Sequence, residues 1–366
     1  MKDPREYKRC TQDQCGKARS EPCALTVRSL IFLALFLVPL TLGAAAAPDP
    51  SLIPSIFSPE STPAYATNQL SYFVLETTAG IFAFVFALIA YVIIRFRRRA
   101  NDDGMEPPQV YGSNPVEVAW TTVPFLIVLV LALTTARVIQ EIQDPVKPEG
   151  ALEVQVVGHQ WWWEIRYPKL GIVTANELHV PVSDRDKRAP TSMELRSADV
   201  VHSFWVPRLS GKTDLIPNHK NTMWIEPNRT GLFVGQCAKY CGTEHALMLL
   251  RVYVHTPEDF EAWVNQQRTL AAAEPGVAAG RLVFERTACV NCHTLNGTIG
   301  NGRFGPDLTH LMSRQTLGSG ALDNTPDNLR DWIKNPNRFK PGALMPAMNL
   351  SGPELDQIVA YLVTLK

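Results

Sequence analysis

Residues 236–248 read QCAKYCGTEHALM, and four of their side chains are ligands for soft transition metals. Two cysteines lie four residues apart, a histidine follows four residues later, and a methionine three residues after that: Cys237, Cys241, His245 and Met248. A single blue-copper site uses two histidines, one cysteine and a weak axial methionine. This stretch has one cysteine more and one histidine fewer than such a site requires.

A second histidine for the metal must come from elsewhere in the chain. The segment ADVVHSFWVP, residues 198–207, offers His202. Two bridging cysteines with one histidine per metal would hold two copper ions, and the ions would share one electron with little change of geometry. Met248 and a main-chain carbonyl between the cysteines would fill the weak axial positions. A zinc site of two cysteines and two histidines is the alternative, although it leaves Met248 unused. A disulfide is another common use of paired cysteines.

A second motif, CVNCH at residues 289–293, matches the attachment sequence of c-type haem. The thiols of Cys289 and Cys292 would bond to the haem vinyl groups, and His293 would take one axial position. A methionine is the expected sixth ligand, because ligation by methionine and histidine raises the haem potential for electron transfer. The candidates are Met312, Met345 and Met348.

The first 140 residues contain three apolar runs. The first run, residues 29–50, follows a basic segment and ends in small residues. This pattern predicts a secretory signal peptide over residues 1–47, cut among Ala44–Ala47. An uncleaved anchor helix is the alternative.

The other two runs, residues 72–94 and 116–136, are each long enough for a membrane-spanning helix, which needs about 20 apolar residues. The sequence RFRRR follows the first of them, and positive charge marks the cytoplasmic side. We therefore predict a transmembrane hairpin over residues 65–140 with its loop in the cytoplasm. The chain after this hairpin is expected outside.

Composition and pattern describe the rest of the chain. A length of 366 residues suggests two or three domains. The 35 basic and 35 acidic side chains leave no positive excess for nucleic acid. Short alternating runs bounded by Pro, Gly, Asn or Asp predict an antiparallel β-sandwich or barrel over residues 150–256. A linker is expected over residues 265–276, and helical segments predict an all-α domain over residues 277–366.

Three segments resemble subunit II of haem–copper cytochrome c oxidases: GHQWWWEIRYP at 158–168, DVVHSFWVPRLSGKTDLIPN at 199–218, and the cysteine stretch itself. The resemblance implies a transmembrane hairpin and a cupredoxin-like domain with a binuclear copper-A centre. Its ligands would be His202, Cys237, the main-chain carbonyl of Lys239, Cys241, His245 and Met248. The family usually has a glutamate at position 239, which also reaches a magnesium ion shared with subunit I. The Lys239 side chain cannot bind that cation.

The C-terminal residues 277–366 resemble small cytochromes c. Besides CVNCH, they contain GPDL at 305–308 and PGALMPAMNLS at 341–351, which resembles the methionine loop before the last helix of those proteins. On that resemblance the sixth haem ligand is Met345. A copper-A subunit with a fused cytochrome c corresponds to the caa3-type arrangement.

The family resemblance gives roles to two further residues. In similar subunits electrons enter at the tryptophan after His-Gln, which corresponds to Trp161. By strand alternation Trp161 and Trp163 would share one face, Trp162 is expected in ordinary core packing, and His159 is expected to be a structural hydrogen-bonding residue. In similar subunits a glutamate where the second membrane helix begins marks the mouth of a proton path into subunit I, which corresponds to Glu117. The alternative for Glu117 is an interfacial anion stabilised by the helix dipole.

The predicted protein is therefore the electron-input subunit of a terminal respiratory oxidase in the bacterial inner membrane, with its C-terminal domains on the periplasmic side. Electrons would pass from haem c to the copper pair and on to the haem and copper-B of subunit I, where dioxygen is reduced to water with proton translocation. Expected partners are subunit I, other membrane subunits and an external donor such as a cytochrome c or the bc1 complex. The alternatives are the copper-A subunit of a nitric oxide reductase and a membrane-tethered electron carrier without an enzyme partner.

Overall fold

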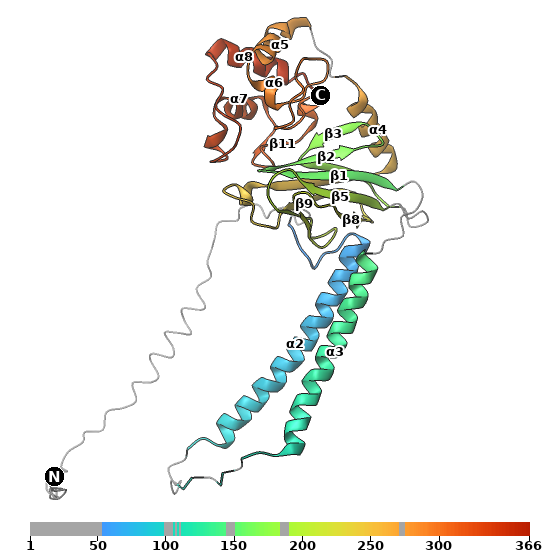
Figure 1. The fold of residues 1–366 in the computed structure, drawn as a ribbon, viewed down its shortest axis with the longest axis vertical. Helices are drawn as coiled ribbons and strands as arrows, with labels where there is room; N and C mark the ends of the chain where they lie inside the picture. Colours follow the sequence, from blue (N-terminus) through green and yellow to red (C-terminus); the bar gives the residue numbers. More distant parts are fainter. Residues whose placement is uncertain are drawn as a thin grey trace, which may run out of the picture. The chain divides into compact units, whose positions relative to one another are not determined.

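The computed structural model describes residues 53–98, 105–106, 108–109, 111–143, 151–183, 190–270 and 275–366. The predicted signal peptide, residues 1–47, lies outside the described residues. Pro48–Lys366 form one compact unit. Along the chain this unit consists of two long helices, a β-sandwich and a C-terminal helical domain (Figure 1).

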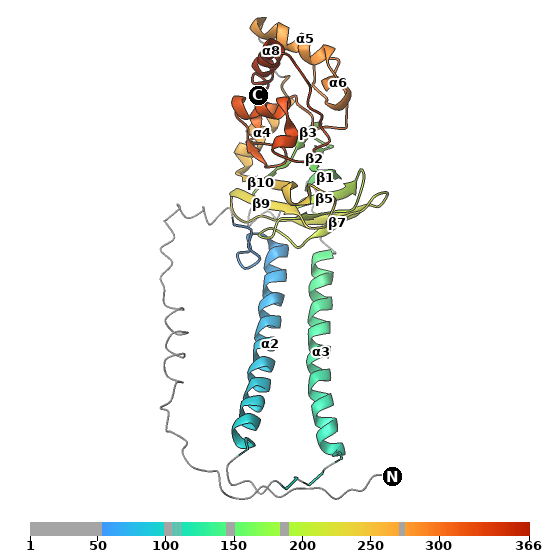
Figure 2. The ribbon, with the colours of Figure 1, turned by 90° about the vertical axis from the view of Figure 1, so that its left-hand side faces the viewer.

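The two long helices are α2 (Thr62–Arg95) and α3 (Asn114–Gln143), and both are apolar and long enough to cross a membrane. At about 1.5 Å per residue, the 34 residues of α2 extend roughly 50 Å, which exceeds the ~30 Å hydrocarbon core of a bilayer. Most of their apolar side chains are exposed, as lipid-facing side chains would be. Figure 2 shows the two helices below the β-sandwich. Both helices extend beyond the predicted apolar runs.

Both helices form hydrogen bonds with the β-sandwich near their ends. The Glu226 backbone N–H donates to Ser61 Oγ over 2.8 Å at the start of α2, and the Glu60 N–H donates to the Arg208 carbonyl over 2.7 Å. Near the end of α3, the Trp224 indole N–H donates to the Ile142 carbonyl over 2.7 Å. These hydrogen bonds connect the ends of both helices to the β-sandwich.

The β-sandwich consists of two five-stranded sheets, ordered β3-β2-β1-β5-β8 and β4-β10-β9-β6-β7. The strands are β1 (Leu152–His159), β2 (Trp162–Tyr167), β3 (Ile172–Ala175), β4 (Glu177–Pro181), β5 (Thr191–Ser197), β6 (His202–Trp205), β7 (Thr213–Leu215), β8 (Asn221–Ile225), β9 (Gly231–Cys237) and β10 (Leu249–His255). The sandwich is the predicted architecture.

The predicted antiparallel arrangement differs from the structure at two pairs of strands. β1 pairs with β5 in parallel, and β10 pairs with β4 in parallel. Parallel neighbours need a long connection, and here several intervening strands supply it. Alternation within one strand reports which face is buried, but it does not report which distant strand lies beside it.

The core lies between the two sheets and reaches the predicted metal ligands. Trp163, Tyr167, Phe204 and Phe233 are almost completely buried in it. The same cluster contains Cys237, Cys241 and Met248 at one end of the sandwich. The soft ligands therefore pack against the buried apolar core.

Helix α4 (Pro257–Arg268) follows the last strand. Its N-terminus is capped by Thr256 Oγ1, which accepts a hydrogen bond from the Asp259 N–H over 3.1 Å. Trp263 on its buried face contacts the Tyr167 ring, with centroids 5.2 Å apart. The helix continues to Arg268, so the first residues of the predicted linker are helical.

The C-terminal domain is mostly helical. Its elements are η3 (Pro275–Val277), α5 (Ala278–Arg286), α6 (Cys289–Cys292), η4 (Leu311–Ser313), β11 (Thr316–Leu317), β12 (Leu322–Asp323), α7 (Pro326–Lys334), η5 (Pro336–Arg338) and α8 (Gly352–Leu362). Helices α5 and α8 cross at Gly280, where an added Cβ would lie 2.0 Å from the Gln357 carbonyl oxygen. The two-residue strands β11 and β12 were not expected from the sequence, because their pairing is too short to leave an alternating pattern.

Candidate metal and haem sites

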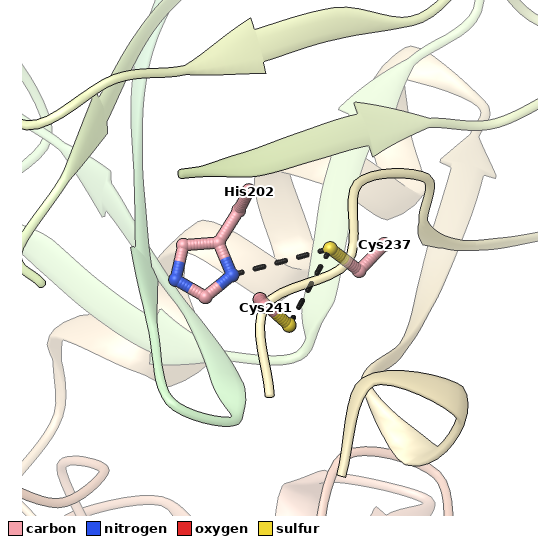
Figure 3. A group of neighbouring side chains, drawn as sticks. All are labelled: His202, Cys237 and Cys241. Atoms are coloured by element: carbon pink, nitrogen blue, oxygen red, sulfur yellow. Dashed lines mark hydrogen bonds between the residues drawn. The ribbon is translucent and has the colours of Figure 1, made fainter. Parts of the chain in front are cut away.

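The centre of the candidate metal site is the cysteine pair. Cys237 ends β9, and Cys241 lies in the loop that follows. Their sulfur atoms are 3.9 Å apart (Figure 3). A disulfide requires about 2.05 Å, and both cysteines are free. The pair therefore offers two separate sulfur ligands, as the copper interpretation requires and the disulfide alternative does not.

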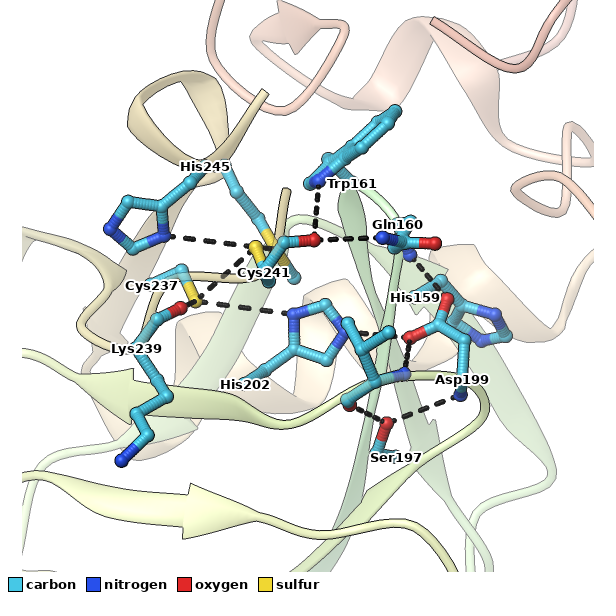
Figure 4. A network of polar contacts seen from close by, with 12 residues as sticks. His159, Gln160, Trp161, Ser197, Asp199, His202, Cys237, Lys239, Cys241 and His245 are labelled. Atoms are coloured by element: carbon cyan, nitrogen blue, oxygen red, sulfur yellow. Dashed lines mark hydrogen bonds and ion pairs between the residues drawn. The ribbon is translucent and has the colours of Figure 1, made fainter. Parts of the chain in front are cut away.

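The other predicted ligands surround this pair. His202 Nδ1 lies 3.9 Å from the Cys237 sulfur, and His245 Nδ1 lies 3.7 Å from the Cys241 sulfur. Met248 Sδ lies 3.9 Å from the Cys241 sulfur, and the Lys239 carbonyl oxygen lies 3.1 Å from the Cys237 sulfur. Figure 4 shows one histidine beside each cysteine.

This donor set fits soft metal ions. Metal–thiolate bonds are about 2.3 Å long, so an ion can contact both sulfurs when they are less than about 4.6 Å apart. The ligand atoms of His202, Cys237 and Cys241 all lie within 4.8 Å of one another, and all three residues are buried. Two imidazoles, two sulfurs, a thioether and a carbonyl are the ligand types that copper accepts in electron-transfer sites.

The two thiols influence each other's protonation. Interaction with Cys241 lowers the pKa of Cys237, and hydrogen bonds with His202 and the Ser203 backbone act in the same direction. The same pairing raises the pKa of Cys241, and burial raises it further. One thiolate therefore forms readily, whereas the second proton is displaced when a cation binds.

His202 is oriented by Asp199. His202 is fully buried, and its Nε2 lies 2.7 Å from Asp199 Oδ1, which leaves Nδ1 directed at Cys237. Burial acts to lower the pKa of His202, but the hydrogen bonds with Asp199 and Cys237 raise it above its ordinary value. The His202 ring also packs closely against Gly158, because an added Cβ at this glycine would lie only 2.8 Å from the ring.

Trp161 forms a hydrogen bond with the loop that contains the predicted ligands. Its indole N–H donates to the Cys241 carbonyl over 3.0 Å, and the Gln160 side-chain amide donates to the same oxygen over 2.8 Å (Figure 4). Gly242 has a φ of +121°, and an added Cβ there would lie 2.9 Å from the Trp161 ring. The indole therefore packs closely against the ligand loop.

The side chain of Lys239 points away from the sulfur atoms (Figure 4). Its ammonium lies 3.9 Å from Asp214 Oδ2, and the Lys239 side chain is more than half exposed. The backbone oxygen of Lys239 thus faces the site, whereas its ammonium lies at the surface.

The haem attachment motif lines a cavity of about 430 Å³. Cys289 and Cys292 are free, and both contribute to the wall together with His293. His293 Nδ1 lies 2.7 Å from the Pro306 carbonyl, which fixes the tautomer and leaves Nε2 available as a ligand. Burial lowers the pKa of His293 and thereby favours its neutral form. Thiols, an oriented imidazole and apolar walls fit a covalently attached haem.

The cavity wall narrows the choice of a sixth ligand. Met345 and Met348 both line the cavity. Met312 is not among the described residues that line the cavity. Met345 remains a prediction, because both methionines of the loop reach the cavity.

The same cavity extends to the copper-ligand domain. Gln160, Trp161 and Trp162 line it together with Cys289 and His293. Trp161 therefore contacts the carbonyl of a predicted copper ligand with its indole nitrogen and also borders the haem cavity.

Comparison with known proteins gives three family matches. Residues 52–138 match the transmembrane domain of cytochrome c oxidase subunit II, residues 185–254 match its periplasmic domain, and residues 277–366 match cytochrome c. Cytochrome c oxidase subunit 2 of Alkalihalophilus pseudofirmus is 34% identical over 289 residues, covering 77% of this chain and 82% of that protein. The chain belongs to the cytochrome c oxidase subunit II family.

The chain is also similar to a second subunit 2 and to a solved periplasmic domain. Cytochrome c oxidase subunit 2 of Bacillus sp. (strain PS3) is 32% identical over 291 residues, covering 74% of this chain and 80% of that protein. The crystal structure of the periplasmic domain of cytochrome oxidase subunit II from Bradyrhizobium japonicum is 29% identical, covers 34% of this chain and 97% of that domain, and has a TM-score of 0.31.

The predicted family, fold class and function are thus confirmed. The chain is a membrane-bound subunit II with a fused cytochrome c domain, which fits the caa3-type arrangement. It is the electron-input subunit of a haem–copper oxidase, and its family implies copper and haem c as cofactors. Its membership also implies association with subunit I.

The remaining predicted residues have structural contacts of their own. His159 Nε2 lies 3.0 Å from Glu164 Oε2, and the Trp162 ring stacks on the His159 ring at 4.3 Å. Trp161 precedes β2, yet it packs with Trp163 against the same core cluster. Glu117 lies in the first turn of α3, where its Oε1 accepts the Ser113 N–H over 3.3 Å. That contact supports the alternative of an anion stabilised at the start of the helix, and the proton role of Glu117 stays a prediction.

Sequence reasoning missed three contributors to this subunit II. Asp199 orients His202, Gln160 holds the Cys241 carbonyl, and Lys340 approaches the site from the cytochrome domain. An acid three residues before a predicted ligand is a usable signal for Asp199, because metal-binding histidines commonly donate to a carboxylate. Lys340 has no such signal, since it is 179 residues from Trp161 along the chain.

Proposed function

We propose that electrons from an external donor reach subunit I of the oxidase through haem c and then a copper-A pair of this chain. The observation that supports this route is the position of Trp161, which borders the haem cavity and donates to the Cys241 carbonyl. When bound, haem c and copper supply one-electron redox chemistry. The chain's own contribution is to hold the ligands in a fixed geometry and to exclude water from them.

The copper centre is proposed to be binuclear. Cys237 and Cys241 would bridge the two ions, and His202 and His245 would each serve one ion. Met248 and the Lys239 carbonyl would act as weak axial ligands. The pairing of each histidine with its own cysteine supports this assignment over a single ion. The participation of Met248 supports copper over zinc.

The haem is proposed to be attached through Cys289 and Cys292, with His293 and Met345 as axial ligands. The bond between His293 Nδ1 and the Pro306 carbonyl orients the imidazole for this role. The cavity walls are mostly apolar, and ligation by methionine and histidine would raise the haem potential for electron transfer.

The remaining assignments concern the membrane complex. We propose that the chain resides in a bacterial inner membrane with its copper and haem domains on the periplasmic side, next to subunit I and other membrane subunits. The donor is a cytochrome c or a bc1 complex, and dioxygen is reduced in subunit I with proton translocation. Glu117 is proposed as a collector of protons at the water–membrane boundary.

The proposed route is tested on the purified complex with dioxygen as acceptor. Photochemical reduction of haem c should be followed by reduction of copper and then by consumption of dioxygen. Consumption of nitric oxide in place of dioxygen would contradict the proposed acceptor. A copper centre that stays oxidised while haem c is reduced would contradict the proposed route.

A further inference from the structure

Lys340 is a buried cation between the cytochrome domain and the copper-ligand domain. Only 4% of the residue is exposed. Its ammonium donates to three carbonyl oxygens: Trp161 at 2.7 Å, Leu247 at 2.9 Å and Gly318 at 3.2 Å. An ammonium group has three N–H donors, so each of them has a carbonyl partner.

The three carbonyls come from three separate segments. Trp161 lies in the turn between β1 and β2, and Leu247 lies in the copper-ligand loop directly before Met248. Gly318 belongs to the turn between β11 and β12 of the cytochrome domain. One side chain therefore connects the proposed electron-input residue, the proposed copper ligands and the haem domain.

Neighbouring contacts hold the same turn in place. The Leu249 N–H donates to the Ser319 carbonyl over 3.1 Å, and Ser319 Oγ donates to the Leu249 carbonyl over 2.8 Å. Glu177 Oε1 accepts the N–H groups of Gln315 at 2.8 Å and Thr316 at 3.1 Å. Lys340 is thus one of several hydrogen-bonding residues that connect the two domains.

The donors of Lys340 match the three buried carbonyls around it. Burial lowers the pKa of Lys340 to about 8, and the nearby Glu244 acts in the opposite direction. An ammonium satisfies three buried carbonyls at once, which an apolar side chain of similar length cannot do.

We propose that Lys340 is a positioning residue for electron transfer between the domains. It fixes the Trp161 turn against the haem cavity and holds the Leu247 carbonyl, which precedes Met248. The inference rests on the proposed function, because it assigns Lys340 a part in the route from haem to copper. It does not make Lys340 a ligand of either cofactor.

The test compares Lys340→Met with Lys334→Met in the full-length protein loaded with copper and haem. Lys334 is an exposed lysine at the end of α7 in the same domain, so its replacement is a matched loss of charge. We expect Lys340→Met to slow haem-to-copper transfer by at least about tenfold, since a small misplacement is costly to a positioned reaction. Lys334→Met should leave the rate unchanged.

Hydrogen exchange provides a readout independent of electron transfer. Lys340→Met should increase exchange in residues 159–163, 246–249 and 316–320, while the copper and haem spectra stay close to those of the unchanged protein. If Lys340→Met fails to take up its cofactors, Lys340→Gln replaces it. That variant keeps amide donors, and it should give an intermediate rate and intermediate exchange.

The outcomes separate this inference from the proposed function. No transfer from haem to copper in the unchanged protein would overturn the proposed function. Normal transfer in that protein, with rates and exchange in both Lys340 variants equal to those of Lys334→Met, would overturn the role of Lys340 alone.

Discussion

Replacing Asp199 by asparagine should weaken copper binding without unfolding the protein. Asp199 Oδ1 accepts His202 Nε2 at 2.7 Å and the Val200 N–H at 2.6 Å, and its Oδ2 accepts the Gln160 N–H at 2.6 Å. Asparagine keeps one acceptor oxygen and replaces the other by an N–H₂ group. One existing donor must then face another donor, so the orientation of His202 or of the Trp161 turn is lost.

The expected magnitude follows from these contacts. Loss of a hydrogen-bond partner of a metal-binding histidine typically reduces metal affinity by about 10- to 100-fold, which corresponds to about 1.4–2.7 kcal/mol. Hydrogen bonds to a charged group are worth about 1.5–3 kcal/mol, so the two values agree. Because the Asp199 carboxylate is partly exposed, the lower half of the range is expected.

Chelator competition, followed through the copper absorption, measures this affinity. Asp214→Asn serves as the control, because Asp214 is a partly exposed acid of the same domain whose carboxylate pairs with the Lys239 ammonium at 3.9 Å rather than with His202. The control should bind copper like the unchanged protein. Equal affinities in Asp199→Asn and Asp214→Asn would show that Asp199 does not orient a ligand.

Three other predictions concern the haem, the membrane and acid stability. Met345→Ala should remove the weak sulfur-to-iron band near the red end of the oxidised spectrum while the haem stays attached; loss of the band in Met348→Ala alone would transfer the ligand role to Met348. Glu117→Gln should slow steady-state turnover of the oxidase but leave copper reduction unchanged, whereas normal turnover across pH would favour the role of an anion at the start of the helix. Burial acts to raise the pKa of Glu164, but hydrogen bonds from a histidine and an arginine hold it below its usual value. A lowered pKa in the folded state contributes stability above the unfolded value of about 4.3 and loses it as the pH falls further. Glu164→Gln should therefore lower the denaturation midpoint at pH 7 and flatten its dependence below about pH 4; unchanged curves would show that this carboxylate contributes nothing.

The candidate copper and haem residues could be predicted from the sequence because their chemistry is local. The cysteine stretch and CVNCH each contain several ligands within a few residues, so spacing alone indicates a common centre. The membrane helices are equally local, since an uninterrupted apolar run has few other uses. His202 is the least local of these candidates, because β6 joins β9 only in the folded sheet.

Long-range pairing limits what the sequence can predict. The parallel pairs β1–β5 and β4–β10 leave no mark in the alternation of any single strand. Lys340 was not recognised for the same reason, because its three acceptors come from distant turns. Met345 and Met348 are three residues apart and both reach the haem cavity, so neither spacing nor burial separates them.

Electron paramagnetic resonance of the copper-loaded protein tests the copper centre most directly. A Cys289→Ser/Cys292→Ser variant of the full chain prevents haem attachment and leaves the copper signal isolated. One electron shared by two equivalent copper nuclei of spin 3/2 gives a seven-line hyperfine pattern, and metal analysis should find two copper ions per chain. A four-line pattern with one copper ion per chain would contradict the bridging roles of Cys237 and Cys241.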